Sequence, residues 1–497
     1  MESILHNVFM GFGVAFSPVN LFYCFIGVLI GTLVGVLPGL GPPAAIALLL
    51  PGTFQMNPVA AMIMLAGIYY GAMYGGSTTS ILVNIPGETG SVVTCLDGYQ
   101  MARQGGAGRA LGISAFGSFI AGTLGLMGLM LMAPVLIRVA LRFGPAEYFS
   151  LMVLGIVLII FLAQGSLIKS LLIAGAGLLL STVGTDLISG TYRFTFNYPI
   201  LMDGIGLIPV TMGMFGVAEV LTNIEEGLDR EIYVSRIKNL LPTLEDWRRS
   251  IGPILRGSVI GFFLGILPGG GAVLASFASY ATEKRISKTP EKFGTGMIEG
   301  VAGPESANNA GSSGAFVPLL TLGLPSNVVT ALLLGALMIY GLQPGPLLMA
   351  KRPDLFWGLI TSMYIGNVIL LILNLPLIGI WVQLLKVPYA LLFPFILLFS
   401  LIGVYSLNNS SAEIFIMILF GVFGFLAKKF GYEAAPLILA LVLGPLLENA
   451  FRQSLILSGG SFSIFISSPI SALLFGSAVL LLFAPLLRNL ARKPRAE

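Results

Sequence analysis

Long apolar segments alternate with short polar ones along nearly the whole chain. A membrane-spanning helix needs about 20 mostly apolar residues, so the pattern predicts an all-α polytopic membrane protein with about 10–14 transmembrane helices, some of them broken or re-entrant. The apolar segments cover roughly 19–37, 41–51, 59–84, 109–137, 147–163, 167–189, 200–221, 251–280, 311–324, 327–343, 355–385, 389–407, 411–427, 434–449 and 464–488.

One strongly polar stretch divides this pattern into two halves. Residues 222–250 carry 5 basic and 6 acidic side chains, more than any other stretch of similar length. Short basic segments between spans are typical of cytoplasmic loops. We therefore expect a first repeat over 1–221, an amphipathic cytoplasmic linker over 222–250, and a second repeat over 251–497 that ends in a basic cytoplasmic tail.

A glycine motif occurs once in each half. Residues 27–41 read GVLIGTLVGVLPGLG and residues 257–271 read GSVIGFFLGILPGGG, which match at 8 of 15 positions. Glycines at four successive i+4 steps allow another helix to approach closely, and Pro-Gly at the end of an apolar helix frees backbone groups at membrane depth. Paired, interrupted apolar segments in two halves of a chain indicate the binding site of a transporter.

A second pair of interrupted segments supports two pseudo-symmetric repeats. Residues 75–88 read GGSTTSILVNIPGE, residues 311–327 read GSSGAFVPLLTLGLPSN, and their prolines, Pro86 and Pro325, are 239 residues apart. Basic residues flank the second glycine motif on both sides and the first on neither. This asymmetry favours an inverted repeat.

A different set of basic residues argues against inversion. Arg103 and Arg109 follow the second broken segment of the first half, much as Lys351 and Arg352 follow that of the second half.

The two Leu-Pro-Gly breaks are the first candidate binding elements. A helix that starts again after such a break exposes backbone amides, and these amides together with the helix dipole bind anions. The alternative is a kink that serves packing only. The residues expected at the substrate from these breaks are Pro38, Gly39, Gly41, Gly269, Gly270 and Gly271.

The second candidate is a run of hydroxyl and amide side chains inside an apolar segment. Polar groups at membrane depth are costly unless they are satisfied, so these residues are suited to a substrate carboxylate or a small cation. Alternatively, Ser and Thr bond back to carbonyls of their own helix. The expected substrate-binding residues here are Ser77, Thr78, Thr79, Asn84, Pro86, Gly87 and Glu88, and Pro325, Ser326 and Asn327 extend the site from the second half.

The third candidate is the oxygen-rich run over 303–313. One carboxylate among several neutral oxygens suits a Na⁺ site or a titratable proton carrier, whereas the alternative is an ordinary polar loop. The expected coupling-ion residues are Asn84, Glu305, Ser306, Asn308, Asn309, Ser312 and Ser313.

The sequence gives no indication of an enzyme. There is no G-x-x-x-x-G-K-[ST] phosphate loop, and the single histidine, His6, leaves no Ser/His/Asp arrangement within the membrane. The net charge of +4 is carried in short loops and gives no reason to expect nucleic acid. We expect no catalytic residues, no cofactor beyond Na⁺ or H⁺ as coupling ion, and no metal other than Na⁺.

Five runs resemble one transporter family: GVLPGLGP, YGGSTTSILVNIPGE, LDGYQMARQGGAGRALGIS, GILPGGGA and EGVAGPESANNAGSSGAFVPLLTLGLPSNVVTALLLGALMIYGLQPGP. From about residue 20 to 450 the chain resembles the large membrane subunit of the bacterial tripartite tricarboxylate transporters, the TctA family. The resemblance implies a permease of the bacterial inner membrane. Its partners would be a small four-helix membrane subunit and a periplasmic solute-binding protein.

The same resemblance implies uptake of a carboxylate such as citrate by alternating access, coupled to a Na⁺ or H⁺ gradient. Glu88 departs from the smaller, less charged residue expected after Pro86-Gly87, so citrate itself is in doubt.

Three other classes of function stay open from the residues alone. An ion channel also uses Gly-rich re-entrant loops, as selectivity filters. A stand-alone carboxylate symporter would transport without the binding protein. A membrane-embedded enzyme or scaffold is the third. Saturable uptake that needs the binding protein and stops when the ion gradient collapses separates the first two from a tripartite transporter.

Overall fold

The computed structural model describes residues 2–37, 41–163, 165–186, 188–226, 237, 239–387 and 389–491. The helices up to residue 226 are α1 (Glu2–Ala15), α2 (Pro18–Val36), α3 (Pro42–Leu49), α4 (Pro58–Val83), α5 (Thr94–Met101), α6 (Ala107–Ala140), α7 (Pro145–Leu162), α8 (Leu167–Ser181), α9 (Leu207–Thr211) and α10 (Ala218–Glu226). Short helical turns are η1 (Pro51–Thr53), η2 (Thr89–Val92), η3 (Ala102–Gly106), η4 (Pro199–Leu201) and η5 (Met212–Val217), and the two strands are β1 (Gly184–Thr185) and β2 (Tyr192–Arg193).

The remaining helices lie after residue 243. They are α11 (Leu244–Ile266), α12 (Gly271–Ile286), α13 (Glu299–Gly314), α14 (Phe316–Leu322), α15 (Val328–Ile339), α16 (Pro346–Lys351), α17 (Pro353–Asn374), α18 (Ile378–Leu384), α19 (Tyr389–Asn408), α20 (Ser411–Lys429), α21 (Ala435–Leu457), α22 (Ile464–Ser467) and α23 (Pro469–Ala491), with one turn, η6 (Pro290–Lys292).

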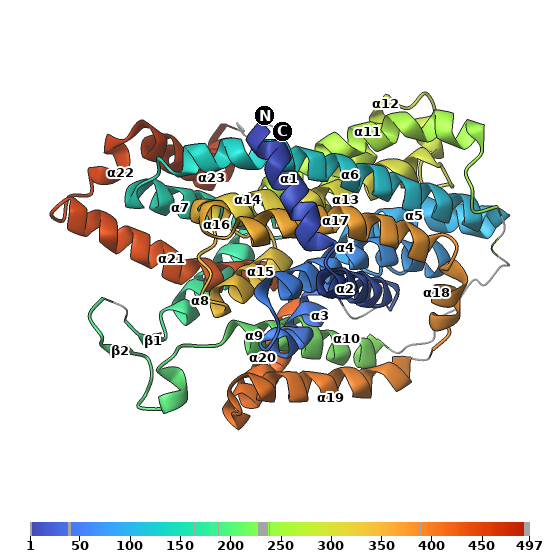
Figure 1. Cartoon of the computed structure of the whole chain (residues 1–497). Coiled ribbons are helices and arrows are strands. Elements are labelled where there is room, and N and C mark those ends of the chain that lie inside the picture. The colour runs from blue at the N-terminus through green and yellow to red at the C-terminus, as the bar shows by residue number, and fades with distance from the viewer. Residues whose placement is uncertain are drawn as a thin grey trace, which may run out of the picture.

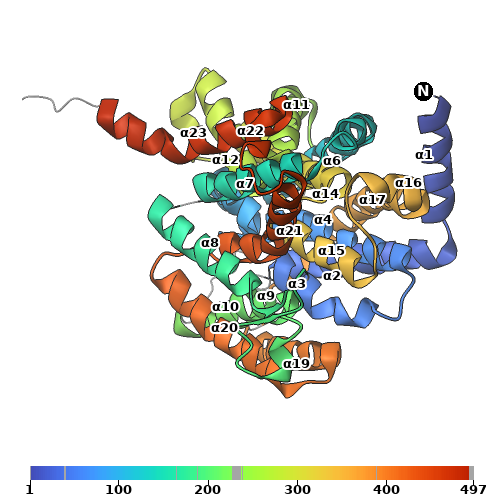
Figure 2. The same ribbon diagram turned by 90° about the vertical axis from the view of Figure 1, so that its left-hand side faces the viewer.

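Most long helices run side by side across the molecule, as a membrane bundle requires (Figure 1). The β1–β2 hairpin and α22 lie at one end of the bundle, and α18 lies at the other. Figure 2 shows α1 at one edge and α19 and α20 on a side away from α11 and α12. Ten of the described helical segments are long and apolar enough to cross a membrane, which confirms the prediction of an all-α polytopic membrane protein.

Burial separates a central helix from peripheral ones. Every residue of α4 from Val59 to Val83 is buried, whereas α19 and α20 expose large apolar side chains such as Phe395 and Phe415. Exposed apolar surface of this extent suits contact with lipid.

Two predicted apolar segments are interrupted in the structure. The segment 167–189 is helical only to Ser181, and the β1–β2 hairpin begins at Gly184 (φ 124°), a backbone conformation that favours glycine. The segment 355–385 divides into α17 and α18 on either side of Pro376, because proline cannot donate a hydrogen bond within a helix. Apolar character alone did not distinguish these connections from helix.

The glycine motifs form equivalent helix contacts in the two halves. A Cβ on Gly31 of α2 would lie 2.5 Å from the carbonyl oxygen of Ile68 of α4, and a Cβ on Gly261 of α11 would lie 2.2 Å from that of Ala307 of α13. The two glycines are 230 residues apart and their partners 239. Only glycine permits this distance, so the motif fixes α2 against α4 and α11 against α13 in the same way.

The second pair of interruptions also shares its backbone path. Helix α4 ends at Asn84 (φ 60°, ψ 28°) and α14 ends at Gly323 (φ 70°, ψ 26°), both left-handed. Four residues later Glu88 (φ −146°, ψ 166°) and Asn327 (φ −152°, ψ 175°) are extended and cap the next helical turn. We call residues 84–91 break one and residues 323–330 break two. Their equivalence confirms the predicted second repeated interruption.

The direction of the helices shows how the halves are related. Within each half the glycine helix runs parallel to its partner, since Gly31 contacts Ile68 and Gly35 contacts Ala72. Between the halves the helices run in opposite directions. The earlier residue Tyr69 lies against the later residue Phe316, with ring centroids 6.0 Å apart, whereas the later residue Ser77 contacts the earlier residue Glu305. Because α4 and α13 are antiparallel, the two repeats are inverted.

The predicted linker is only partly described. Residues 227–236 and 238, which include Arg230, Arg236 and Lys238, lie outside the described residues, as do residues 492–497 of the basic tail. Helix α10 ends at Glu226 and α11 begins at Leu244, inside the predicted linker. The division of the chain into 1–221, 222–250 and 251–497 stays a prediction.

Candidate functional site

A buried polar cluster surrounds break one. Glu305 of α13 is fully buried, and its two carboxylate oxygens accept hydrogen bonds from the hydroxyls of Ser77 on α4 and Thr94 on α5. The oxygen-rich run 303–313, for which a polar loop was one alternative, forms part of helix α13 and is buried throughout. The expected coupling residue Glu305 therefore lies where the two repeats meet.

Glu88 is the second carboxylate of this cluster and is only 6% exposed. Its Oε2 accepts from the amide of Gly90 at 2.5 Å, and its Oε1 accepts from Nδ2 of Asn308 at 2.9 Å. Ser91 completes the cap: its hydroxyl donates to the Glu88 carbonyl at 2.9 Å and accepts from Ser80 at 2.9 Å. The first repeat thus supplies the carboxylate and the second repeat supplies the amide that binds it.

Both carboxylates have neutral partners only. Within the described part of the chain, no Lys or Arg forms an ion pair with Glu88 or Glu305. A buried carboxylate without a counter-charge costs several kcal/mol or more and is stabilised by a proton or a bound cation. The cluster is therefore chemically suited to take up a positive charge.

Break two repeats the cap with neutral groups. Asn327 Oδ1 accepts from the Thr330 amide at 2.9 Å, and Asn327 Nδ2 donates to the Tyr69 hydroxyl at 2.8 Å. Asn327 is equivalent to Glu88, and Tyr69 is equivalent to Asn308, each 239 residues apart. A side chain of each repeat therefore hydrogen-bonds to the cap residue of the other repeat, but only the cap of break one is charged.

The amides at the two helix starts already have partners. Glu88 occupies the Gly90 amide, and Asn327 occupies the Thr330 amide. An anionic substrate would have to replace these side chains to use the helix starts in the way that the sequence predicts. The substrate-binding role of Pro86, Gly87 and Pro325, which lie within the breaks, stays a prediction.

The Leu-Pro-Gly motif of the second half lies beside break two. Pro38 and Gly39 are outside the described residues, and Gly41 precedes α3. In the second half Gly269 (φ 78°) donates its amide to the Ser326 carbonyl at 2.9 Å, and α12 starts just after. The predicted residues Gly269, Gly270 and Gly271 are therefore brought to break two.

The other predicted residues are distributed over several positions. Thr79 donates to the Val36 carbonyl at 2.7 Å, and Thr78 is buried. Asn84 is exposed, and no hydrogen bond to the described residues involves its side chain, so its predicted role at the coupling ion stays a prediction. The hydroxyls of Ser306 and Ser326 are buried without a partner in the described part of the chain. Asn309, Ser312 and Ser313 lie near α6 and α17.

Sequence reasoning missed several members of the site. Ser91 is the last residue of break one, Thr94 follows it, and Tyr69 and Asn367 come from α4 and α17. Asn367 had a usable signal, since an amide within an apolar span is costly unless it is functional or satisfied. Tyr69 had none, because a tyrosine among apolar residues is ordinary in a membrane helix.

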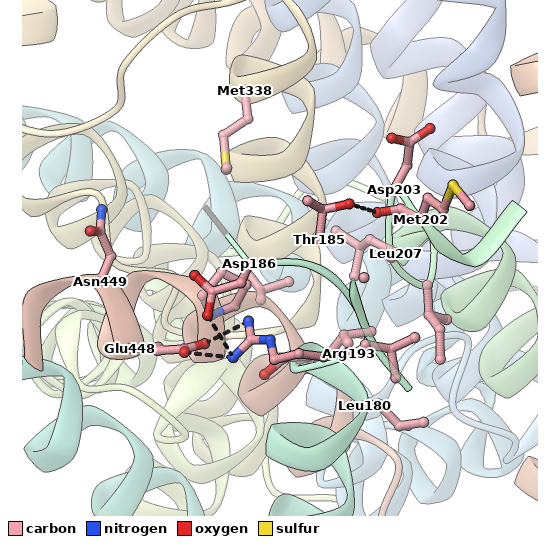
Figure 3. Close-up of a pocket in the computed structure, with 18 of the residues that line it drawn as sticks. Leu180, Thr185, Asp186, Arg193, Met202, Asp203, Leu207, Met338, Glu448 and Asn449 are labelled. Carbon is pink, nitrogen blue, oxygen red and sulfur yellow. Dashed lines mark hydrogen bonds and ion pairs between the residues drawn. The ribbon is translucent and has the colours of Figure 1, made fainter. Parts of the chain in front are cut away.

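A separate cavity lies beside the β1–β2 hairpin (Figure 3). It has a volume of about 480 Å³ and is lined from α8, α9, α15, α21 and the hairpin. Arg193 contacts Glu448 at 2.7 Å, and Arg452 contacts Asp186 at 2.8 Å. The amides of Ser189 and Ile188 are the main cause of an Asp186 pKa lowered to about 2. None of the predicted site residues lines this cavity, and its arginines are neutralised by acids.

Inverted repeats with paired broken helices and buried carboxylates define a transporter of the multi-pass membrane class. The family model described as the tripartite tricarboxylate transporter TctA family matches residues 21–439, and the chain belongs to this family. It is thus a subunit of a tricarboxylate transporter, and the tripartite family implies partner subunits.

Two relatives come from Agrobacterium vitis. A protein described as "Uncharacterized 52.8 kDa protein in TAR-I ttuC' 3'region" is 52% identical over 493 residues, which is 99% of this chain and 98% of the relative. A second, from the TAR-II ttuC' 3'region, is 51% identical over 233 residues, which is 47% of this chain and 96% of the relative. No solved structure matches the chain.

Proposed function

We propose that this chain is the large permease subunit of a secondary transporter that takes up a di- or tricarboxylate by alternating access, driven by a Na⁺ or H⁺ gradient. Its function is transport and not catalysis. The membrane is the inner membrane of a bacterium. The partners are a small four-helix membrane subunit and a periplasmic solute-binding protein that delivers the carboxylate.

The observation that carries the coupling is the pair of buried carboxylates at break one. Glu88 and Glu305 have hydroxyl and amide partners and no basic partner among the described residues. A cation or proton bound there offsets their charge and part of the charge of an anionic substrate nearby. The substrate lies between the two breaks, close to Ser326 and to the exposed Asn84.

The sidedness follows from the basic residues. Arg249 at the start of α11 pairs with Glu299 at the start of α13 at 2.7 Å, and Lys428 at the end of α20 pairs with Glu219 of α10 at 2.9 Å. Basic residues at short connections mark the cytoplasmic side. We therefore place this end in the cytoplasm and the β1–β2 hairpin in the periplasm, on the side of the binding protein.

Uptake by proteoliposomes tests the proposal. The complete three-part system is reconstituted, Na⁺ and H⁺ gradients are imposed separately, and radiolabelled di- and tricarboxylates are offered. We expect saturable accumulation that needs one of the two gradients and stops when the solute-binding protein is omitted.

Each other outcome identifies a different function. Flux that follows only the substrate's own gradient and does not saturate would indicate a channel. Gradient-driven uptake without the binding protein would indicate a stand-alone symporter, and chemical change of the substrate would indicate an enzyme. Any of these results would contradict the proposal.

A further inference from the structure

A second group of buried oxygens lies apart from the carboxylates, around a small cavity between α4, α6, α13 and α17. Its polar lining comes from Asn309, Ser312, Ser313, Tyr74 and Asn367. The remaining lining residues are Tyr70, Gly122, Leu126 and Met363. The described lining contains no acidic or basic side chain.

Asn309 presents an unpartnered oxygen. Its Nδ2 donates to the Ser118 hydroxyl at 2.8 Å and to the Glu305 carbonyl at 3.1 Å, which fixes the orientation of the amide. The Oδ1 atom has no hydrogen-bond partner in the described part of the chain, although the side chain is only 2% exposed. A buried acceptor without a partner destabilises the fold, so this oxygen is suited to hold a ligand.

Three hydroxyl protons around the cavity are already used, and the fourth hydroxyl, that of Tyr70, pairs with Cys24 Sγ at 3.8 Å. Ser312 donates to the Asn309 carbonyl at 2.8 Å, Ser313 donates to the same carbonyl at 3.2 Å, and Tyr74 donates to Asn367 Oδ1 at 2.5 Å. A hydroxyl that already donates its single proton can only accept further hydrogen bonds or ligate a cation through its lone pairs. The oxygens of Asn309, Ser312, Ser313 and Tyr74 therefore act as acceptors, which repel an anion and attract a cation.

The volume of the cavity and the lack of charged lining residues indicate which cation it can bind. The cavity has a volume of about 10 Å³, at the lower limit for a single water molecule, so it favours an ion smaller than water. Divalent ions bind preferentially where carboxylates ligate them, and the lining has none.

We propose that this cavity binds one dehydrated Na⁺ ion, held by Asn309 Oδ1 and the hydroxyl oxygens of Ser312, Ser313 and Tyr74. It is a second cation site, separate from the carboxylates of Glu88 and Glu305. The ion site stands without the transport proposal, but its role in driving uptake rests on that proposed function.

Ion binding is measured on the purified full chain in nanodiscs, without substrate or partner subunits. The thermal unfolding midpoint is followed against NaCl, with KCl and choline chloride at the same ionic strength. We expect a saturable, Na⁺-specific rise in Tm, because a ligand that binds only the folded state stabilises it. Tyr74→Phe and Ser313→Ala are each expected to raise the apparent Kd for Na⁺ at least tenfold, and Ser312→Ala is a further variant should either fail to fold.

The controls separate the two cation sites. Ser362→Ala removes an equally buried hydroxyl of α17 that donates to the Leu359 carbonyl, and it is expected to leave the Kd unchanged. Glu305→Gln is expected to keep a Na⁺-specific rise.

Three results would overturn the proposal. They are an equal rise with K⁺ or choline, a Kd that the cavity variants do not change, and a rise that only Glu305→Gln abolishes. The last two would mean that the cavity holds only water. A failure of gradient-driven uptake would leave this binding result standing.

Discussion

Break one and break two have the same backbone and different chemistry. Both begin at a left-handed residue, Asn84 or Gly323, and four residues later both have an extended cap, Glu88 or Asn327. The cap of break one is a buried carboxylate beside a second one, Glu305, whereas the cap of break two is an amide that bonds to a tyrosine.

This difference separates the backbone geometry that both breaks share from the proposed ion coupling, which involves break one only. The inverted repeat needs both breaks to place non-helical backbone inside the membrane, and the equivalent glycine contacts at Gly31 and Gly261 maintain this arrangement in each half. Only break one has charged groups, Glu88 and Glu305, and we propose that the coupling ion binds there. Substitutions of the shared glycines should therefore lower stability equally in both halves. Substitutions of the carboxylates at break one should lower gradient-driven uptake.

The largest expected effect is the loss of Glu305. Glu305→Gln keeps the size of the side chain and removes the charge that attracts the coupling ion. We expect gradient-driven uptake to fall by about 100-fold or more, which corresponds to about 2.7 kcal/mol. Uptake by proteoliposomes of the complete transporter measures it. Glu413→Gln removes a buried carboxylate of α20 that accepts from Asn408 Nδ2 and, among the described residues, has no hydrogen bond to either break. It serves as the control and should change uptake little.

The second-largest effect is expected from substitutions in the two glycine motifs. Gly31→Ala and Gly261→Ala each force a Cβ against a backbone carbonyl that cannot move away, and overpacking of this kind costs about 1–3 kcal/mol. We expect similar drops in Tm for both variants. Gly175→Ala in α8 is the control, since nothing lies within 4 Å of its added Cβ. A large drop in one half only would contradict the shared scaffold.

The scaffold could be predicted from sequence better than the site could. The glycine motif occurs twice with the same residue spacing, and this spacing predicted both the close helix contacts and the paired breaks. The polar contacts depend on which helices lie side by side: Glu305 of α13 meets Ser77 of α4 across 228 residues of chain, and no local pattern encodes that contact. Glu305 and Asn308 were nevertheless identified, because carboxylates and amides beside an apolar run are costly without a function.

The two caps should differ in their effect on stability. Asn327→Ala removes a neutral cap and should cost about 1–2 kcal/mol. Glu88→Ala removes a cap as well as a buried, unpaired charge, so part of the loss is recovered and the cost should be smaller. Thermal unfolding of both variants in detergent without added coupling ion measures the difference. A larger loss for Glu88→Ala would mean that its charge is compensated in the folded protein.

The smallest effect is expected at the left-handed residues. Asn84→Gly gives break one the residue that break two has at the equivalent position, and it should change stability by no more than about 0.5 kcal/mol. Asn84→Ala keeps a Cβ at φ 60° but loses the short polar side chain that makes Asn tolerant of this conformation, and it should cost about 1 kcal/mol. Equal Tm values for the two variants would show that the left-handed conformation is not required.

The most direct test of coupling at break one compares accumulation with exchange in the same vesicles. The double variant Glu88→Gln/Glu305→Gln should lose gradient-driven accumulation of the carboxylate and still exchange labelled for unlabelled substrate across the membrane, since the substrate path is intact but the ion no longer drives it. Full gradient-driven accumulation by this variant would contradict the assignment of the coupling charge to break one.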